Sequence, residues 1–117
     1  MIIHLNNRAL LKFSGSENKA FLQAQLSNDI SKIDYSHVQL NAYCQHQGKI
    51  LALFWVIRTG DDFLLSFPLD LLDSINARLQ MFVLMSDVKI TNVTKQYLQI
   101  GLIGKSQKDS LTINGQL

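Results

Sequence analysis

The sequence contains few of the residues that mark secreted, metal-binding or multidomain proteins. Among 117 residues there is one cysteine, Cys44, and one proline, Pro68. A single thiol cannot form an internal disulfide or a site built from several thiolates, and it is more typical of a reducing compartment than of a secreted protein. One proline leaves no candidate for a stiff linker. The composition therefore predicts a single cytoplasmic domain of ordinary size.

Long apolar runs and an excess of one charge are missing as well. The longest apolar run is ILALFWVI at 50–57, far shorter than the ~20 residues that span a bilayer. The N-terminus lacks the basic and apolar regions of a secretory signal peptide. Eleven Lys and Arg residues against nine Asp and Glu residues give a net charge of +2, too balanced to predict a surface for phosphate groups. We therefore expect neither a membrane span nor direct binding of nucleic acid.

The apolar pattern predicts an α+β fold. Alternation along 38–44 is typical of a strand with one buried face, and the continuous run at 50–57 is typical of a central strand covered on both faces. Helices are predicted at about 15–27 and 69–84, the second from an apolar stripe at helical spacing. The order strand, helix, two or three antiparallel strands, helix, strand predicts a ferredoxin-like split βαβ layer. In this layer a mostly antiparallel sheet carries two helices on one face.

Several polar residues have a structural interpretation. Ser14 stands three residues before Glu17, the spacing of a capping box at the start of the first helix. Cys44 alternates with apolar residues, which predicts a buried, unreactive thiol rather than a nucleophile activated by His46. His4, His37 and His46 are scattered along the chain, with no second ligand three or four residues later in the sequence, so we predict no metal ligand. We also predict no catalytic residue in this chain. The segment SGSENKA lacks the glycine spacing and the lysine of a phosphate-binding loop.

The stretch FLQAQLSNDI, at 21–30, raises a question because its helix ends on adjacent polar side chains. Gln25, Ser27, Asn28 and Asp29 are more than an ordinary helix stop needs. In one interpretation, Asn28 and Asp29 cap or turn the chain. In the other, the same loop faces a ligand whose donors and acceptors match its amides and carboxylate. The two interpretations are compatible.

Three segments resemble the N-terminal part of YgfZ-type folate-binding proteins, relatives of the glycine-cleavage T-protein (aminomethyltransferase). FLQAQLSNDISKI is similar to F-L-Q-G-Q-L-T-N-D-V, LNAYCQHQGKI to A-x-C-x-x-x-G-K, and PLDLLDSINARLQMFVLMSDVKI to L-x-x-Y-x-x-x-S-K-V-x-I. The resemblance runs from about residue 5 to 104. It predicts a folate-binding-type N-terminal domain at 1–104, followed at 105–117 by a polar tail or the start of a truncated domain.

The resemblance implies tetrahydrofolate or a folate derivative as the cofactor, held where three domains meet. By this resemblance the folate-binding residues here are Gln25, Asn28, Asp29 and Arg8. Arg8 stands where some relatives carry a pterin-contacting aromatic residue, and a guanidinium can pair with glutamyl carboxylates. The resemblance also implies an accessory role in iron–sulfur enzyme maintenance and tRNA modification, with the remaining domains and iron–sulfur enzymes as partners.

Two departures from the family pattern bear on enzymatic activity. Aminomethyltransferases carry two aspartates after a glycine pair, whereas GKILALF places Ala52 and Leu53 there, and neither can exchange a proton. The signature K-G-C-x-x-G-Q-E, associated with the iron–sulfur role, is absent from the chain. We therefore expect no enzymatic activity from this domain alone. The alternatives are part of a folate-dependent aminomethyltransferase whose catalytic groups lie downstream, or an interaction domain without a ligand.

Overall fold

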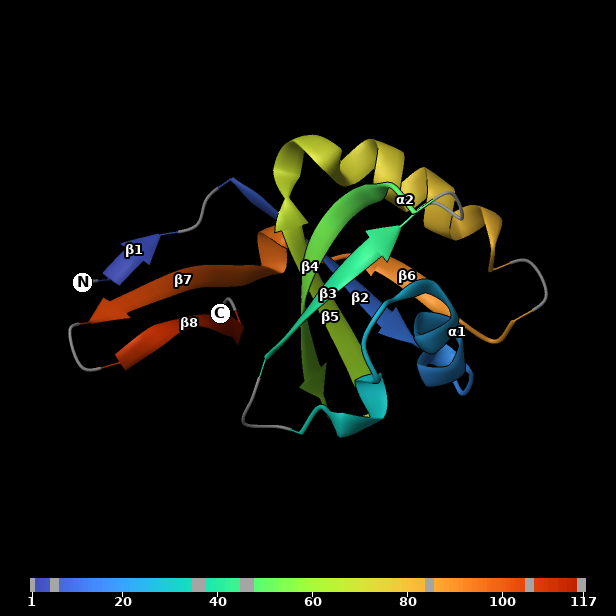
Figure 1. Ribbon diagram of the computed structural model, residues 1–117, viewed down its shortest axis with the longest axis horizontal. Helices are drawn as coiled ribbons and strands as arrows, with labels where there is room; N and C mark the ends of the chain where they lie inside the picture. The colour runs from blue at the N-terminus through green and yellow to red at the C-terminus, as the bar shows by residue number, and fades with distance from the viewer. Residues whose placement is uncertain are drawn as a thin grey trace.

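The computed structural model describes a main antiparallel sheet with helices (Figure 1). Its backbone is described for residues 2–4, 7–34, 38–44, 48–83, 86–104 and 107–115, and its side chains for 7–34, 38–44, 48–83 and 86–97. Within these ranges the main sheet has five strands, β2 (Arg8–Ser14), β3 (Gln39–Cys44), β4 (Ile50–Thr59), β5 (Asp62–Pro68) and β6 (Lys89–Asn92). Their order is β3-β4-β5-β2-β6, and all neighbours are antiparallel.

A small second sheet projects from one side of the main sheet (Figure 1). It has the order β1-β7-β8 and consists of β1 (Ile2–His4), β7 (Tyr97–Gly104) and β8 (Gln107–Gly115). Segment 105–117, predicted to be a tail or the start of another domain, thus contains a strand that pairs with β7. A 3-10 turn, η3 (Thr94–Gln96), joins β6 to β7.

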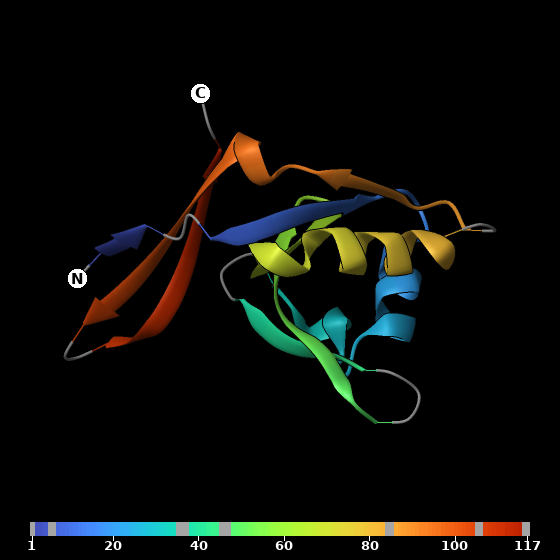
Figure 2. The ribbon, with the colours of Figure 1, turned by 90° about the horizontal axis from the view of Figure 1, so that it is seen from above.

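The described helices lie on one face of the main sheet. Helix α1 (Asn18–Gln25) buries Phe21 and Leu22, and helix α2 (Leu72–Met81) buries Ile75 and Leu79, all in one core cluster. That cluster also contains alternate residues of β2, Ala9, Leu11 and Phe13. Figure 2 shows both helices on the same side of β2 and β6. The α+β prediction is confirmed, with three strands between the helices, and we call this side the helical face.

The opposite side, which we call the open face, is covered unevenly. Leu10, Leu64 and Val93 form a small cluster where the chain crosses from β6 to β7. Ile57 of β4 packs against this cluster, whereas Leu53, earlier on the same face of β4, is 49% exposed. The prediction that segment 50–57 is a central strand buried on both faces is therefore wrong. Strand β5, with Phe63 to Phe67 all buried, occupies that place.

The face of β3 that packs against the core is the opposite of the predicted one. Asn41 and Tyr43 are buried, whereas Leu40 and Cys44 are exposed. The Tyr43 ring stacks with Phe54 at a centroid distance of 5.8 Å, and the Asn41 amide is satisfied by hydrogen bonds. A buried amide is tolerated when its donors and acceptors are paired. The prediction of a buried Cys44 is wrong, and His46 lies outside the described residues.

The start of α1 is held by a carboxylate from another segment rather than by a capping box. Ser14 belongs to β2, and Glu17 Oε2 accepts from Asp87 N at 2.8 Å. In return, Asp87 Oδ2 accepts from Ser16 N at 3.0 Å and Ser16 Oγ at 2.6 Å. These bonds hold the pKa of Asp87 below its ordinary value. Gly15, at φ 104°, allows this approach because a Cβ there would lie 2.2 Å from Asp87 O.

Candidate functional site

The loop after α1 runs along the outer edge of β3. Leu26 forms an antiparallel bridge with Tyr43, Ala42 N donates to Ser27 Oγ at 3.0 Å, and Asn28 Nδ2 donates to Leu40 O at 2.6 Å. Strand β3 lies at the edge of the main sheet, so its outer amide and carbonyl groups would otherwise be left for another chain to pair with. The polar side chains of this loop therefore take the place of a neighbouring strand.

Asn28 and Asp29 also shape the loop itself. Asn28 N donates to Asn41 Oδ1 at 2.8 Å, which joins the loop to the buried amide of β3. Asp29 Oδ1 accepts from Ser31 N at 3.0 Å and Ser31 Oγ at 2.5 Å, starting the short 3-10 helix η1 (Ile30–Lys32). These two bonds lower the pKa of Asp29. The interpretation that Asn28 and Asp29 cap and turn the chain is confirmed.

A glutamine that sequence reasoning did not select closes this loop. Gln23 Nε2 donates to Asn28 O at 2.9 Å, and Ile30 N donates to Gln23 Oε1 at 2.9 Å. Gln25, the predicted residue, is half-buried, and its side chain makes no hydrogen bond within the described ranges. Both glutamines lie in α1, and the sequence alone gives no signal to separate them. Only the path of the loop decides which amide it meets.

Arg8 lies on a different strand and on the open face. It pairs with Pro68 in the register of β2 and β5, and it shares a face with Leu10 because strand side chains alternate. Its Nε donates to Ser66 Oγ at 2.9 Å. Ser66 is 0% exposed, and Arg8 is half-buried. Loss of hydration at this position lowers the pKa of Arg8.

The four predicted binding residues do not form one cluster. Gln25, Asn28 and Asp29 lie at the outer edge of β3, whereas Arg8 is on β2, three strand spacings or about 14 Å across the sheet. Whether any of them contacts a ligand stays a prediction. Between the loop and Arg8, one row of paired residues crosses the sheet on the open face. In this row Leu40 pairs with Trp55, and Trp55 pairs with Ser66.

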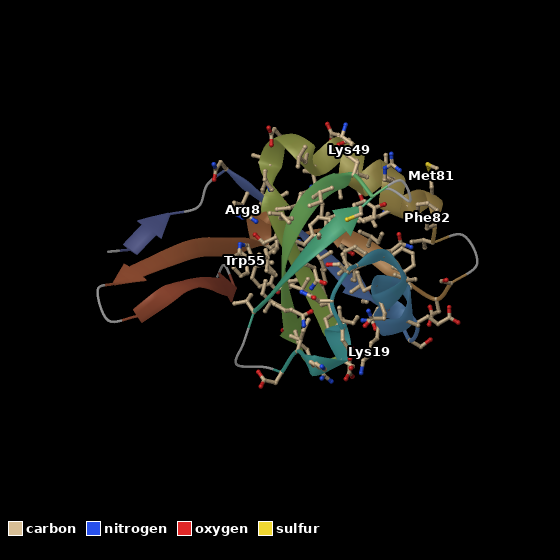
Figure 3. The ribbon with its side chains drawn as sticks, viewed as in Figure 1. Arg8, Lys19, Lys49, Trp55, Met81 and Phe82 are labelled. Atoms are coloured by element: carbon tan, nitrogen blue, oxygen red, sulfur yellow. The ribbon has the colours of Figure 1, made fainter. Side chains whose placement is uncertain are left out.

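This row runs through an exposed apolar surface that sequence reasoning missed. Leu40 is 43% exposed, Leu53 is 49% exposed, and Trp55 is half-buried. We call these three residues the open-face patch. Figure 3 shows Trp55 and Arg8 toward the same end of the main sheet. Alternation along 38–44 predicts that Leu40 is a core residue, and the continuous apolar run at 50–57 predicts the same for Leu53. Only the position of the helices shows that both face outward.

A cavity elsewhere on the molecule carries charges of both signs. A cavity of about 460 Å³ lies between the loop before α1 and the β4–β5 turn, and it is lined in part by Lys19, Arg58, Asp61 and Asp62. Lys12 Nζ lies 3.4 Å from Asp62 Oδ2. Such balanced charge selects neither anions nor cations. Within the described parts of the chain, no three potential metal-binding side chains gather, and no helix is long and apolar enough to cross a bilayer.

Known proteins resemble this chain over most of its length. It is 38% identical to an aminomethyltransferase of Exiguobacterium sibiricum over 92 residues, 78% of this chain and 25% of that protein. It is 28% identical to the tRNA-modifying protein YgfZ of Colwellia psychrerythraea over 104 residues, 89% of this chain and 32% of that protein. The chain thus spans about a quarter to a third of these relatives. No family model matches it.

A solved structure shares the fold. The glycine cleavage system aminomethyltransferase T from Bartonella henselae aligns with a TM-score of 0.77 and 14% identity, over 89% of this chain and 28% of that chain. Further matches include YgfZ of Vibrio vulnificus, 23% identical over 107 residues, 92% of this chain and 32% of that protein. The sequence resemblance, the fold and these relatives agree. The chain is therefore a domain of the YgfZ-like and aminomethyltransferase-like kind.

Proposed function

We propose that this domain forms one wall of a tetrahydrofolate site in a longer protein. The observation that carries the proposal is the open-face patch. Leu40 of the edge strand β3 and Leu53 of its paired neighbour β4 remain nearly half exposed although both are large apolar residues. A contiguous exposed apolar surface is typical of a binding site. Folate is proposed because relatives of this chain are aminomethyltransferases and YgfZ-type proteins.

The chemistry of the patch suits a flat ring with a polar edge. Aromatic side chains such as Trp55 stack against flat rings, and small-molecule sites are mostly apolar with a few placed polar groups. Asn28 is bonded to the carbonyl of Leu40, so the loop after α1 borders the patch. We propose that this border meets the pterin edge. Of the predicted residues near this border we propose Gln25 for this contact, because Asn28 and Asp29 already use their side chains within the loop.

The wall lacks the acid that aminomethyl transfer would need. Ala52 is buried and Leu53 is exposed at the positions where the resemblance places aspartates, and neither β3 nor β4 contains Asp or Glu. This favours an accessory protein over a transferase. We propose a cytoplasmic role in iron–sulfur enzyme maintenance and tRNA modification, in line with relatives named tRNA-modifying protein YgfZ. The proposed partners are the remaining domains and iron–sulfur client enzymes.

One comparison favours a second candidate. The 38% identical relative is an aminomethyltransferase, so the longer protein is alternatively a transferase whose acidic groups come from other domains. The two candidates differ in a glycine-cleavage assay with the longer protein. An accessory protein binds tetrahydrofolate without supporting methylene transfer, whereas a transferase does both.

Calorimetry with tetrahydrofolate tests the proposed site. We expect Trp55→Ala in the longer protein to weaken binding about tenfold, or about 1.4 kcal/mol, because the ring loses its stacking surface. Phe82→Ala is the matched control, since Phe82 is also exposed but follows α2. The 117-residue chain should bind at least tenfold more weakly than the longer protein, because one wall buries little of the ligand. Unchanged binding by Trp55→Ala and by Leu53→Lys, with the fold intact, would refute the proposal.

A further inference from the structure

Ser66 is an unexpected residue for its position. It lies in β5 between Leu65 and Phe67, and all three side chains are buried. A hydroxyl in such surroundings is unfavourable unless it is hydrogen-bonded. Its Oγ accepts from Arg8 Nε at 2.9 Å, so the buried hydroxyl meets a charged donor.

The register shows what this bond does to Arg8. Ser66 pairs with Leu10 on one side and with Trp55 on the other. Arg8 is two residues before Leu10 on the same face, and its side chain reaches Ser66. The bond therefore holds the guanidinium over β5, on the side of β2 where Trp55 lies on the next strand. Both labelled side chains lie at the same end of the sheet in Figure 3.

The hydrogen bond also restricts the orientation of a planar group. A guanidinium has five N–H donors in one plane, of which a carboxylate takes two in parallel. Because Nε–H is directed at Ser66, the plane cannot rotate without breaking that bond. Half-burial of Arg8 beside apolar side chains strengthens its attraction to an anion, since less water screens the charge.

We propose that Ser66 is a positioning residue, which holds Arg8 ready to bind a carboxylate of a ligand whose flat ring lies on the open-face patch. The ligand class is thus a flat heterocycle that carries a carboxylate at a distance. This inference rests on the proposed function. In a folate the carboxylates are those of the glutamyl tail, so Arg8 would recognise the tail while Trp55 contacts the ring.

A pair of ligands separates tail recognition from ring binding. In the longer protein, Arg8→Ala and Ser66→Ala are measured by calorimetry with tetrahydrofolate and with 6-methyltetrahydropterin, which has the ring but no carboxylate. We expect Arg8→Ala to weaken tetrahydrofolate binding about tenfold and Ser66→Ala several-fold, with the pterin unaffected. The double variant should bind no more weakly than Arg8→Ala, because Ser66 acts through Arg8. Ser66→Thr, which retains the hydroxyl, should restore binding.

Two variants serve as matched controls. Lys12→Ala removes another cation of β2, and Ser14→Ala removes a hydroxyl bonded to Lys89 O, both outside the site. Neither should change tetrahydrofolate binding. As a measurement independent of the ligand, the Arg8 Nε–H resonance of the unliganded protein should shift in Ser66→Ala and not in Ser14→Ala.

The outcomes distinguish this inference from the proposed function. Equal weakening of both ligands by Ser66→Ala would assign Ser66 a packing role, and additive effects in the double variant would show that it acts independently of Arg8. Either result overturns the positioning role. Tetrahydrofolate binding that is unaffected by Arg8→Ala but weakened by Trp55→Ala overturns this inference alone. Failure of the unaltered longer protein to bind either compound overturns both proposals.

Discussion

The two faces of the main sheet are built from the same strands and differ in what covers them. On the helical face, Phe13, Phe54 and Phe67 are fully buried under α1 and α2. On the open face, Leu40 of β3 and Leu53 of β4 each lie next to a buried residue of the helical face, yet they remain nearly half exposed. Large apolar residues thus lie on both faces, and the larger core cluster is the one on the helical face. Apolar residues left uncovered in this way point to binding rather than to folding.

The largest expected effect separates neighbouring residues of β4. Phe54→Ala should lower the free energy of unfolding by about 3–5 kcal/mol, because it removes a fully buried ring from the core. That ring contacts Phe67 at a centroid distance of 5.2 Å. Leu53→Ala, one residue away on the open face, should cost less than about 1 kcal/mol. Urea denaturation of both variants measures the contrast, and similar losses would mean that the two faces are equally packed.

A second prediction concerns the connection to the helical face. Gly15→Ala should destabilise the protein by about 2 kcal/mol or more, since a Cβ would meet Asp87 O and the backbone is left-handed there. Gly60→Ala is the control. Gly60 also has a positive φ, of 60°, but nothing lies within 4 Å of its added Cβ. It should cost only the backbone strain, about 1 kcal/mol. Equal melting temperatures for the two variants would argue against the close approach to Asp87.

A smaller effect is expected at the edge that both faces share. Asn28→Ala removes the side-chain bond to Leu40 O and should cost about 1 kcal/mol in thermal or urea unfolding. It also leaves the outer edge of β3 less protected, so self-association should increase at high concentration. Asn76→Ala, on α2, serves as the control for loss of an amide. Light scattering that shows no difference between the variants would contradict the protective role.

The smallest expected effect depends on pH. Bonds from Ser16 lower the pKa of Asp87 in the folded protein, so the carboxylate stabilises the fold fully above its ordinary pKa of about 4. That stabilisation is lost as the pH falls through the lower, folded pKa. The melting temperature of Asp87→Asn should therefore differ most from the wild type near neutral pH and converge with it in acid. A difference that stays constant from neutral pH into strong acid would contradict this account.

Some features of the site were predictable from local chemistry. Asp29 caps the 3-10 turn through Ser31, two residues away, and such short-range bonds depend on little beyond the adjacent sequence. Other partners were not predictable. Gln23 rather than Gln25 closes the loop, and Glu17 bonds to Asp87, 70 residues away. The separation of Arg8 from the loop follows from the strand order, which no local pattern specifies.

The sequence by itself determined the order of helices and strands from β2 to β7, the polar turn after α1 and the family resemblance, because periodicity, turn chemistry and motif spacing are local properties. Only the tertiary structure decided which side of each strand became the core. Period-two alternation separates the residues of a strand into two sets, but it does not say which set the helices cover. In β3 the helices cover Asn41 and Tyr43, since the Asn41 amide finds partners in Asn28 and Gln39 and the Tyr43 ring stacks on Phe54. Leu40 and Cys44 were thereby turned outward, to the face proposed to bind a ligand.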